Sequence, residues 1–247
     1  MSRATPLPSR LAGRSIRIVR PRDAADIYSN PSGEFQRLVE AELLVKVARG
    51  YYAIPPRGAA RQGEWRPTPE AVALGIAIVD YGREHVSLCG VSAARLLGAL
   101  PRAIAAGVVS VPARRPGLRT TVGLVEFWHR DPADVDVHKA RTDLATGWST
   151  TPPQTLLDLA DRPGLGNVDP GTVGEVIWHL AQSVDWKEVH RISEIGKRRA
   201  AYSRALWVCA GIAGGAAPPP HRGRTVSTKG LRSWSDADPA PYGIADD

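Results

Sequence analysis

Residues 21–55, PRDAADIYSNPSGEFQRLVEAELLVKVARGYYAIP, are the stretch from which the fold of the chain is best interpreted. Residues 22–28 have small and apolar side chains on one side, which predicts a brief helix. Residues 29–33 interrupt that helix, because Asn-Pro disfavours continued α geometry. Ser32 is predicted to cap a second helix. This second helix would bury apolar side chains at i, i+3 and i+4, namely Phe35, Leu38 and Val39.

A hairpin is predicted directly after the second helix. Residues 43–47 favour a strand, residues 48–50 contain the turn, and residues 51–54 return as a second strand. Helix, turn, helix and basic hairpin in this order are typical of a winged helix-turn-helix. We therefore expect this element to organise the N-terminal part of the chain.

The arrangement predicts contacts with duplex DNA. A helix that follows a tight turn can enter the major groove, where Gln pairs with adenine and Arg with guanine, so Gln36 and Arg37 are the best-suited readers. Lys46 and Arg49 lie near the hairpin tip, where cations meet phosphates. The alternative is a small helical subdomain with a solvated basic face. The predicted DNA-binding residues are Arg22, Ser29, Asn30, Ser32, Gln36, Arg37, Lys46 and Arg49.

Charge is distributed unevenly along the 247 residues. The formal net charge is +7. Residues 1–66 carry +6, residues 67–186 carry −3, residues 187–232 carry +8 and residues 233–247 carry −4. Positive charge at two separate places favours contact with a polyanion over a general role in solubility. Arg3, Arg10, Arg14, Arg17 and Arg20 could lie along DNA as a basic arm, or they could belong to a disordered basic tail.

Cysteine usage and hydropathy predict a cytoplasmic protein. The two cysteines, Cys89 and Cys209, have apolar neighbours and are expected to pack as small hydrophobes in a reducing compartment. The N-terminal arginines are not followed by the apolar region of a signal peptide. No run reaches the roughly 18 apolar residues that a membrane span requires.

The sequence predicts an α+β fold with two domains. A Pro- and Gly-rich linker places the boundary near residue 60, between a winged helix-turn-helix domain at residues 1–58 and a mixed α/β domain with a helical C-terminal part at residues 67–212. Residues 213–247 are rich in Pro, Gly, Ser and charge, which predicts a disordered tail. Strands are expected at residues 86–88, 108–111 and 120–128, and helices at residues 69–81, 92–100, 150–160, 172–183, 186–195 and 198–212.

No pattern in the chain predicts catalysis, a cofactor or a metal. The six histidines lack partners at metal-ligand spacing, and the chain has no P-loop or nucleophile elbow. A metal-dependent nuclease site could be assembled from Glu126, Asp134, Asp136 and Lys139. We favour an acidic surface loop at these positions, because their spacing fits no complete pattern. The chain is therefore expected not to be an enzyme.

A second basic region is predicted on the C-terminal helices. Aromatic residues Trp186, Tyr202 and Trp207 alternate there with cations, a composition that can grip nucleic acid or an acidic protein. Equally, the cations could be the solvated rim of a helical core. The members of this predicted C-terminal basic patch are Lys187, Arg191, Lys197, Arg198, Arg199 and Arg204.

Three blocks of the chain resemble the AbiEi-type antitoxins of abortive-infection toxin–antitoxin systems, in their actinobacterial form. They are residues 21–54, residues 85–100 (HVSLCGVSAARLLGAL) and residues 150–160 (TTPPQTLLDLA). The resemblance implies a DNA-binding antitoxin that represses its own operon and counteracts a nucleotidyltransferase-like toxin, with or without direct contact. The expected partners are double-stranded promoter DNA, bound by a monomer or homodimer, and the cognate toxin. A winged-helix regulator without a toxin partner is the alternative.

Overall fold

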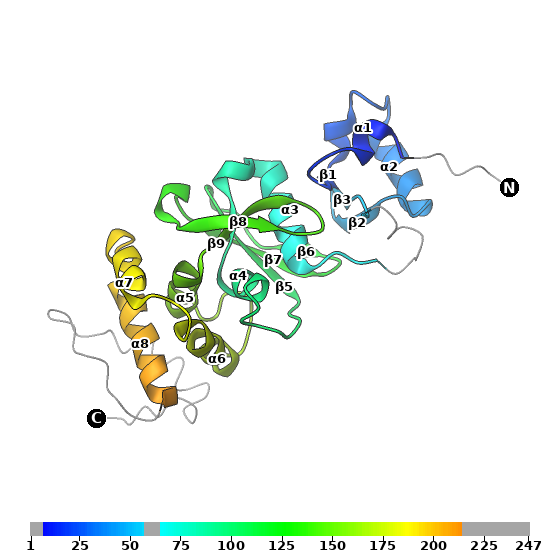
Figure 1. Ribbon diagram of the computed structural model, residues 1–247. Coiled ribbons are helices and arrows are strands. Elements are labelled where there is room, and N and C mark those ends of the chain that lie inside the picture. The colour runs from blue at the N-terminus through cyan, green and yellow to red at the C-terminus, as the bar shows by residue number, and fades with distance from the viewer. Residues whose placement is uncertain (1–6, 57–64, 214–247) are drawn as a thin grey trace. The chain divides into compact units, whose positions relative to one another are not determined.

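The computed structural model describes residues 7–56 and 65–213. Over these residues the fold is α+β, with helices and two sheets (Figure 1). The chain divides into two compact units, which we describe separately. Unit 1 comprises Met1–Leu88, Ile104–Pro132 and Lys139–Trp148, and unit 2 comprises Cys89–Ala103, Ala133–His138 and Ser149–Asp247.

Unit 1 begins with short helices and a small antiparallel sheet. The first elements are α1 (Ser9–Ala12), β1 (Ile18–Val19), the 3-10 helix η1 (Pro21–Ala24) and α2 (Pro31–Glu40). The predicted hairpin follows as β2 (Val45–Ala48) and β3 (Tyr51–Ala53), and the sheet has the order β1-β3-β2. Gly50 in the tight turn has a φ of +82°, which a residue with a side chain rarely adopts.

Two details of the predicted N-terminal helices were wrong. The first helix, expected over residues 22–28, is only the 3-10 turn η1, which starts at Pro21 and in which the Asp23 carboxylate accepts from the Arg20 N–H at 3.1 Å. The second helix starts at Pro31 and is capped by Asn30, whose Oδ1 accepts from the Gly33 N–H at 3.2 Å. Ser32, the predicted cap, lies inside the first turn.

The small sheet is covered by apolar side chains on both faces. Val19 and Tyr52 belong to a core with Phe35 and Leu38 of α2, and the Phe35 and Tyr52 rings meet edge to face at 5.1 Å. The alternate strand residues belong instead to the core of the larger sheet. Alternation of β side chains therefore joins the N-terminal elements to the centre of unit 1.

That centre is α3 (Pro69–Tyr81) on a sheet of order β6-β7-β5-β4-β9-β8. The predicted α3 is confirmed, with Thr68 as its N-cap. Gly75 brings α3 so close to β1 that an added Cβ would lie 2.4 Å from Ile18 Cγ1. The strands are β4 (Ser87–Leu88), β5 (Ala106–Val111), β6 (Leu118–Thr120), β7 (Gly123–His129), β8 (Val137–Arg141) and β9 (Thr146–Thr150), with short 3-10 turns η3 (Arg83–His85) and η4 (Pro132–Asp134).

The predicted strand over residues 120–128 was wrong at its start. Thr121 and Val122 form a turn that separates β6 from β7, and Gly123 after it has a φ of +126°. β6 pairs with β7 antiparallel, whereas β5 pairs with β7 parallel, with Val109 opposite Phe127. The turn therefore reverses the chain, and β7 lies between β6 and β5 in the sheet.

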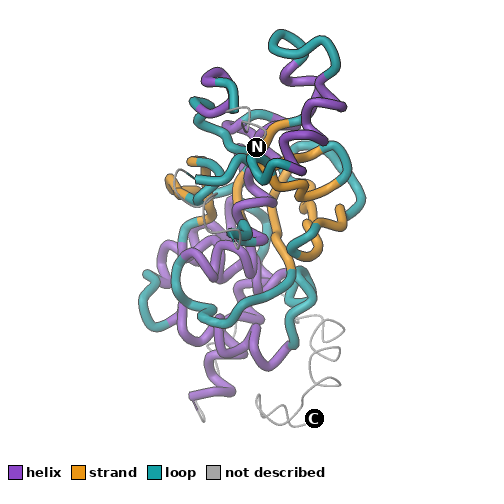
Figure 2. The backbone as a smooth tube through the Cα atoms, turned by 90° about the vertical axis from the view of Figure 1, so that its right-hand side faces the viewer, coloured by secondary structure: helices purple, strands orange, loops and turns teal. Residues whose placement is uncertain are grey.

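Unit 2 is mainly helical, as the purple tube in Figure 2 shows. Its helices are α4 (Gly90–Leu96), α5 (Pro152–Asp161), α6 (Pro170–Ala181), α7 (Trp186–Ile195) and α8 (Arg199–Ala213). Side chains of Thr151, Asp169 and Asp185 cap α5, α6 and α7. The predicted linker around residue 60 and nearly all of the predicted tail lie outside the described residues. Within the described residues, no helix combines the length and the hydropathy that crossing a membrane requires.

Candidate nucleic-acid interface

The eight residues that the sequence predicts to contact DNA are all exposed on the N-terminal elements of unit 1. Ser29 and Asn30 lie in the turn before α2, and Ser32, Gln36 and Arg37 lie along α2. The remaining three occupy η1 and the hairpin, namely Arg22, Lys46 and Arg49. The predicted residues therefore form an outer face of elements whose inner face is core.

The N-terminal turn of α2 depends on a close contact between Asn30 and Gly33. A Cβ on Gly33 would lie 2.7 Å from Asn30 Nδ2, so a larger residue would displace the capping side chain. Phe35 and Leu38, on the opposite side of α2, are 0% and 5% exposed. Burial of these two side chains fixes the rotation of the helix and turns Ser32 and Gln36 outward.

Arg37 has an ion-pair partner within α2. Its Nη1 lies 2.8 Å from Glu34 Oε1, one turn earlier, while 76% of the Arg37 side chain remains exposed. Exposed pairs of this kind contribute little to stability. The guanidinium can therefore exchange Glu34 for another acceptor at low cost.

Lys46 and Arg49 present their charges from the hairpin. Both are exposed, and in the described part of the chain neither has an ion-pair partner. Lys46 stands opposite Tyr52, whose ring packs inward on Phe35. The hairpin thus carries unneutralised positive charge on a rigid, core-packed base.

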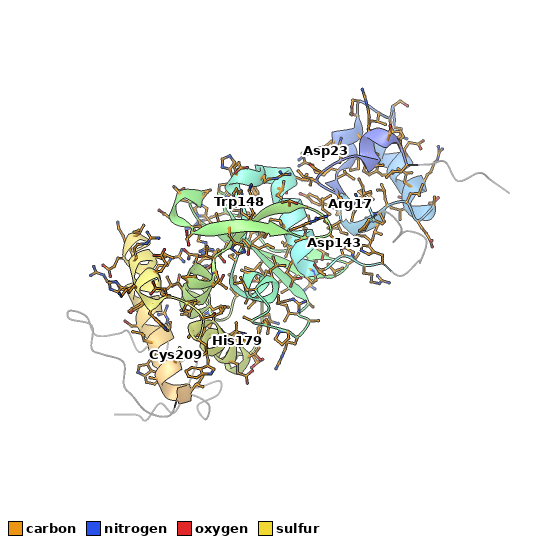
Figure 3. All side chains as sticks on the ribbon, in the orientation of Figure 1. Arg17, Asp23, Asp143, Trp148, His179 and Cys209 are labelled. Atoms are coloured by element: carbon orange, nitrogen blue, oxygen red, sulfur yellow. The ribbon has the colours of Figure 1, made fainter. Side chains whose placement is uncertain are left out.

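The N-terminal arginines predicted as a basic arm are mostly used inside unit 1. Arg17 Nη2 donates to the Pro55 carbonyl oxygen at 2.6 Å, and Arg14 Nη2 donates to the Asp23 carbonyl oxygen at 2.5 Å. Arg20 binds the Asp23 carboxylate with two nitrogens, each at 2.9 Å (Asp23 is labelled in Figure 3). Burial by itself would raise the pKa of Asp23, but the hydrogen bonds from Arg20 outweigh it and lower that pKa.

The carboxylate of Asp80, which the sequence did not single out, collects three donors. Arg20 Nη1 lies 2.7 Å from Oδ1, while the Tyr51 hydroxyl at 2.6 Å and Arg115 Nη1 at 2.7 Å share Oδ2. The Arg115 guanidinium also lies 4.0 Å from the centre of the Phe127 ring. Burial raises the pKa of Tyr51, and the hydrogen bond to Asp80 raises it further. We call Asp80, Arg20, Tyr51 and Arg115 the Asp80 network.

A hollow of about 670 Å³ in unit 1 is lined by residues of both charges, including Arg17 and Asp143 (both labelled in Figure 3). Arg17 donates from Nε to the Ile54 carbonyl oxygen and from Nη2 to the Pro55 carbonyl oxygen. Burial raises the pKa of Asp143. The mixture of charges gives this hollow no preference for an anion. The other lining residues are Pro56, Arg141 and Thr142.

The predicted C-terminal basic patch is largely neutralised within unit 2. Arg191 binds Glu188 through Nε at 2.8 Å, and Arg199 binds Glu194 through Nε at 2.7 Å. Arg204 donates to the Ala160 carbonyl oxygen at 2.7 Å and pairs with Asp161. Of the six predicted cations, Lys187 and Lys197 are exposed with no ion-pair partner in the described part of the chain.

Arg198 is the cation of this set that pairs with a fully buried acid. Its Nη1 lies 2.9 Å from Asp158 Oδ1, and the two side chains are 14% and 0% exposed. Gln154 Nε2 donates to the same oxygen at 2.8 Å. Asp158 lies in the TLLDLA block, so the acid of that block supports the packing of unit 2.

One of the acids considered for a nuclease site, Asp136, makes a structural contact. In unit 2, Asp136 Oδ2 accepts from the Thr151 hydroxyl at 2.6 Å at the start of α5. Over the described residues, no group of three or more His, Cys, Asp or Glu side chains is placed to hold a metal ion. Cys89 is buried, and burial raises the pKa of Cys209 to about 11 (Figure 3). The Cys209 thiol therefore lacks the low pKa of a reactive cysteine.

The comparisons with known proteins bear on the fold. No model of a known protein family matches the chain, and no curated protein matches it. Among solved structures, the chain is similar to the RV2827C protein from Mycobacterium tuberculosis, with a TM-score of 0.52 and 17% sequence identity over 82% of this chain and 78% of that one. At this identity the likeness shows a shared α+β fold.

Proposed function

We propose that the chain is a cytoplasmic DNA-binding antitoxin that represses its own operon through an N-terminal winged helix-turn-helix. The element order α1, β1, η1, α2, β2, β3 and the sheet order β1-β3-β2 support a winged helix, with α2 as the reading helix and the hairpin as the wing. The antitoxin part of the proposal rests on the three sequence blocks that resemble AbiEi-type antitoxins.

One observation carries the DNA-binding part of the proposal. The side chains of η1, of the turn before α2, of α2 and of the hairpin divide into a buried set that builds the core and an exposed set that contains all eight predicted contact residues. The exposed set combines amide and guanidinium groups suited to base edges with unpaired cations suited to phosphates. A solvated face without a ligand would not require this division of chemistry between helix and hairpin.

A mobility-shift titration at fixed, moderate salt tests the proposal. The probes are the DNA upstream of the gene and a shuffled duplex of the same length and composition. We expect tighter binding to the upstream duplex, because α2 would read base edges there. Equal binding to both duplexes would reject a sequence-reading repressor.

Two sets of variants separate reading from phosphate contact. Arg37→Ala or Gln36→Ala is expected to lower affinity for the upstream duplex by about 1–3 kcal/mol and to leave the shuffled duplex almost unchanged. Lys46→Ala or Arg49→Ala is expected to weaken both duplexes alike. If Arg37→Ala weakens both duplexes equally, Arg37 is a phosphate contact and not a reader.

The antitoxin part has its own test. The gene next to this one is expressed alone and together with the full chain, and growth of the cells is measured. An antitoxin is expected to restore growth that a nucleotidyltransferase-like neighbour inhibits. A neighbour without toxicity would leave a winged-helix regulator without a toxin partner. Sedimentation with the upstream duplex then distinguishes a monomer from a homodimer on DNA.

A further inference from the structure

Three arginines in unit 1 lie in the segment that joins β5 to β6 and in β6 itself, and they differ in how far their side chains are buried. Arg115 is held in the Asp80 network, with 21% of its side chain exposed. Arg114 and Arg119 are exposed on either side of it along the chain. Arg115 therefore works as an anchor for the segment of residues 112–120, and its two neighbours are left facing solvent.

The anchored segment is tied to the hairpin at two places. The first tie is Asp80 Oδ2, which accepts from the Tyr51 hydroxyl of β3 and from Arg115. The second tie is a backbone hydrogen bond of 2.8 Å from the Thr121 N–H to the Val47 carbonyl oxygen of β2. Both strands of the hairpin are thereby connected to the ends of one short stretch, residues 115–121.

Apolar packing supports the same connection. Leu118 and Val122 pack against the apolar core that also receives Val45 and Tyr51 of the hairpin. A shared core and two hydrogen-bonded ties make the segment and the hairpin parts of one rigid body. Figure 1 shows β6 close to β2 within unit 1, in agreement with the Thr121–Val47 hydrogen bond.

The charges on this rigid body are unbalanced. In the described part of the chain, Arg114 and Arg119 have no ion-pair partner, and neither do Lys46 and Arg49. Asp80, the acid bound by Arg115, already accepts from three donors. Four exposed cations that repel one another on a fixed frame are stabilised when a polyanion neutralises them together.

We propose that Arg114 and Arg119 contact phosphates of the same DNA duplex as the hairpin, so that residues 112–120 form a second phosphate-binding segment. The inference rests on the proposed DNA-binding function and extends its footprint beyond the N-terminal elements. The segment contributes affinity and not sequence preference, because phosphate contacts do not report base identity.

The salt dependence of binding tests this segment. Arg114→Gln, Arg119→Gln and the double variant are titrated with the upstream and shuffled duplexes over a range of salt concentrations. Each substitution is expected to weaken binding to both duplexes by the same factor. It is also expected to make the negative slope of log K against log salt shallower by about 0.9. Lys187→Gln is the matched control, because it removes one exposed, unpaired charge from α7 of unit 2.

Three outcomes would overturn the inference that residues 112–120 contact DNA. An unchanged slope in the double variant, with wild-type protein still bound to DNA, would overturn the second segment and leave the proposed function intact. Wild-type protein that binds neither duplex would overturn both. A Lys187→Gln loss equal to that of Arg119→Gln would overturn the inference too, because affinity would then follow net charge or the predicted C-terminal basic patch as much as residues 112–120. Urea unfolding midpoints equal to wild type show that the exposed substitutions leave the fold unchanged.

Discussion

The cations around α2 and its hairpin and the cations of α7 and α8 come from similarly basic stretches, but their surroundings differ. Residues 1–66 carry a net charge of +6, and residues 187–232 carry +8. On the hairpin, Lys46 and Arg49 have no ion-pair partner in the described part of the chain, whereas Arg191, Arg198, Arg199 and Arg204 each have an acid within the same unit. The net charge of a segment therefore shows where cations are concentrated, but it does not show how many of them are left unpaired for a ligand.

The largest expected effect concerns the buried pair of unit 2. Asp158→Asn leaves the Arg198 guanidinium without its counter-charge at a site where both side chains are mostly buried. We expect a loss of about 3 kcal/mol in the free energy of unfolding, measured by urea denaturation. The control is Asp161→Asn on the same helix, whose carboxylate is 33% exposed and 3.3 Å from Arg204, with an expected loss below about 1 kcal/mol. Equal losses would mean that the full burial of Asp158 adds nothing to its pairing with Arg198, which would weaken the contrast between the two regions.

The contrast also shows what the sequence could and could not predict. Helices α3 and α7 start and end where predicted, because Thr68 and Asp185 mark their starts and Gly82 and Gly196 follow their ends. Local signals of this kind are present in the chain itself. The predicted first helix was wrong because apolar periodicity over so short a stretch does not distinguish an α-helix from a 3-10 turn that is followed by further turns.

The ion pairs that hold the core were not predictable, because their partners are distant in sequence. Arg198 and Asp158 are 40 residues apart, and Asp80 binds Arg20, which is 60 residues away. Composition shows how many cations a segment has, but only the fold shows which acids reach them. The exposed residues of α2 and the hairpin were identified because amphipathic periodicity separates inner from outer positions. The neutralised arginines of α7 and α8 could not be recognised in this way.

An intermediate effect is expected at the Asp80 network, the counterpart of the buried pair in unit 1. Tyr51→Phe removes the hydroxyl that donates to Asp80 at 2.6 Å and leaves Arg20 and Arg115 in place. We expect unfolding to become easier by about 1.5 kcal/mol, because the acceptor is charged. Tyr52→Phe, the neighbouring residue in β3, is the control and should change stability little. Its ring packs on Phe35, and no hydroxyl partner is found for it in the described part of the chain.

The same variant has a signature in the pH dependence of stability. The pKa of Tyr51 is raised in the folded state, so its contribution is complete below the unfolded value of about 10 and is lost as the pH rises through the higher folded value. Wild-type protein should therefore lose stability above about pH 10 more steeply than Tyr51→Phe does. Parallel curves for the two proteins would show that the hydroxyl is not coupled to Asp80.

The variant with the smallest expected effect on stability tests most directly why the hairpin and the helices α7 and α8 differ. Glu188→Gln combined with Glu194→Gln removes the half-buried acids that bind Arg191 and Arg199, and because these are local pairs near the surface the urea midpoint should stay unchanged. If pairing is what withdraws the charge of α7 and α8, the double variant should bind the shuffled duplex more tightly and with a steeper salt slope, whereas wild type should owe its slope to the hairpin and to residues 112–120. Gln keeps the size of each side chain, so a change in binding reports charge and not packing. An unchanged slope would show that the arginines of α7 and α8 are poorly positioned for DNA even when free, and geometry would then replace neutralisation as the reason that the two regions differ.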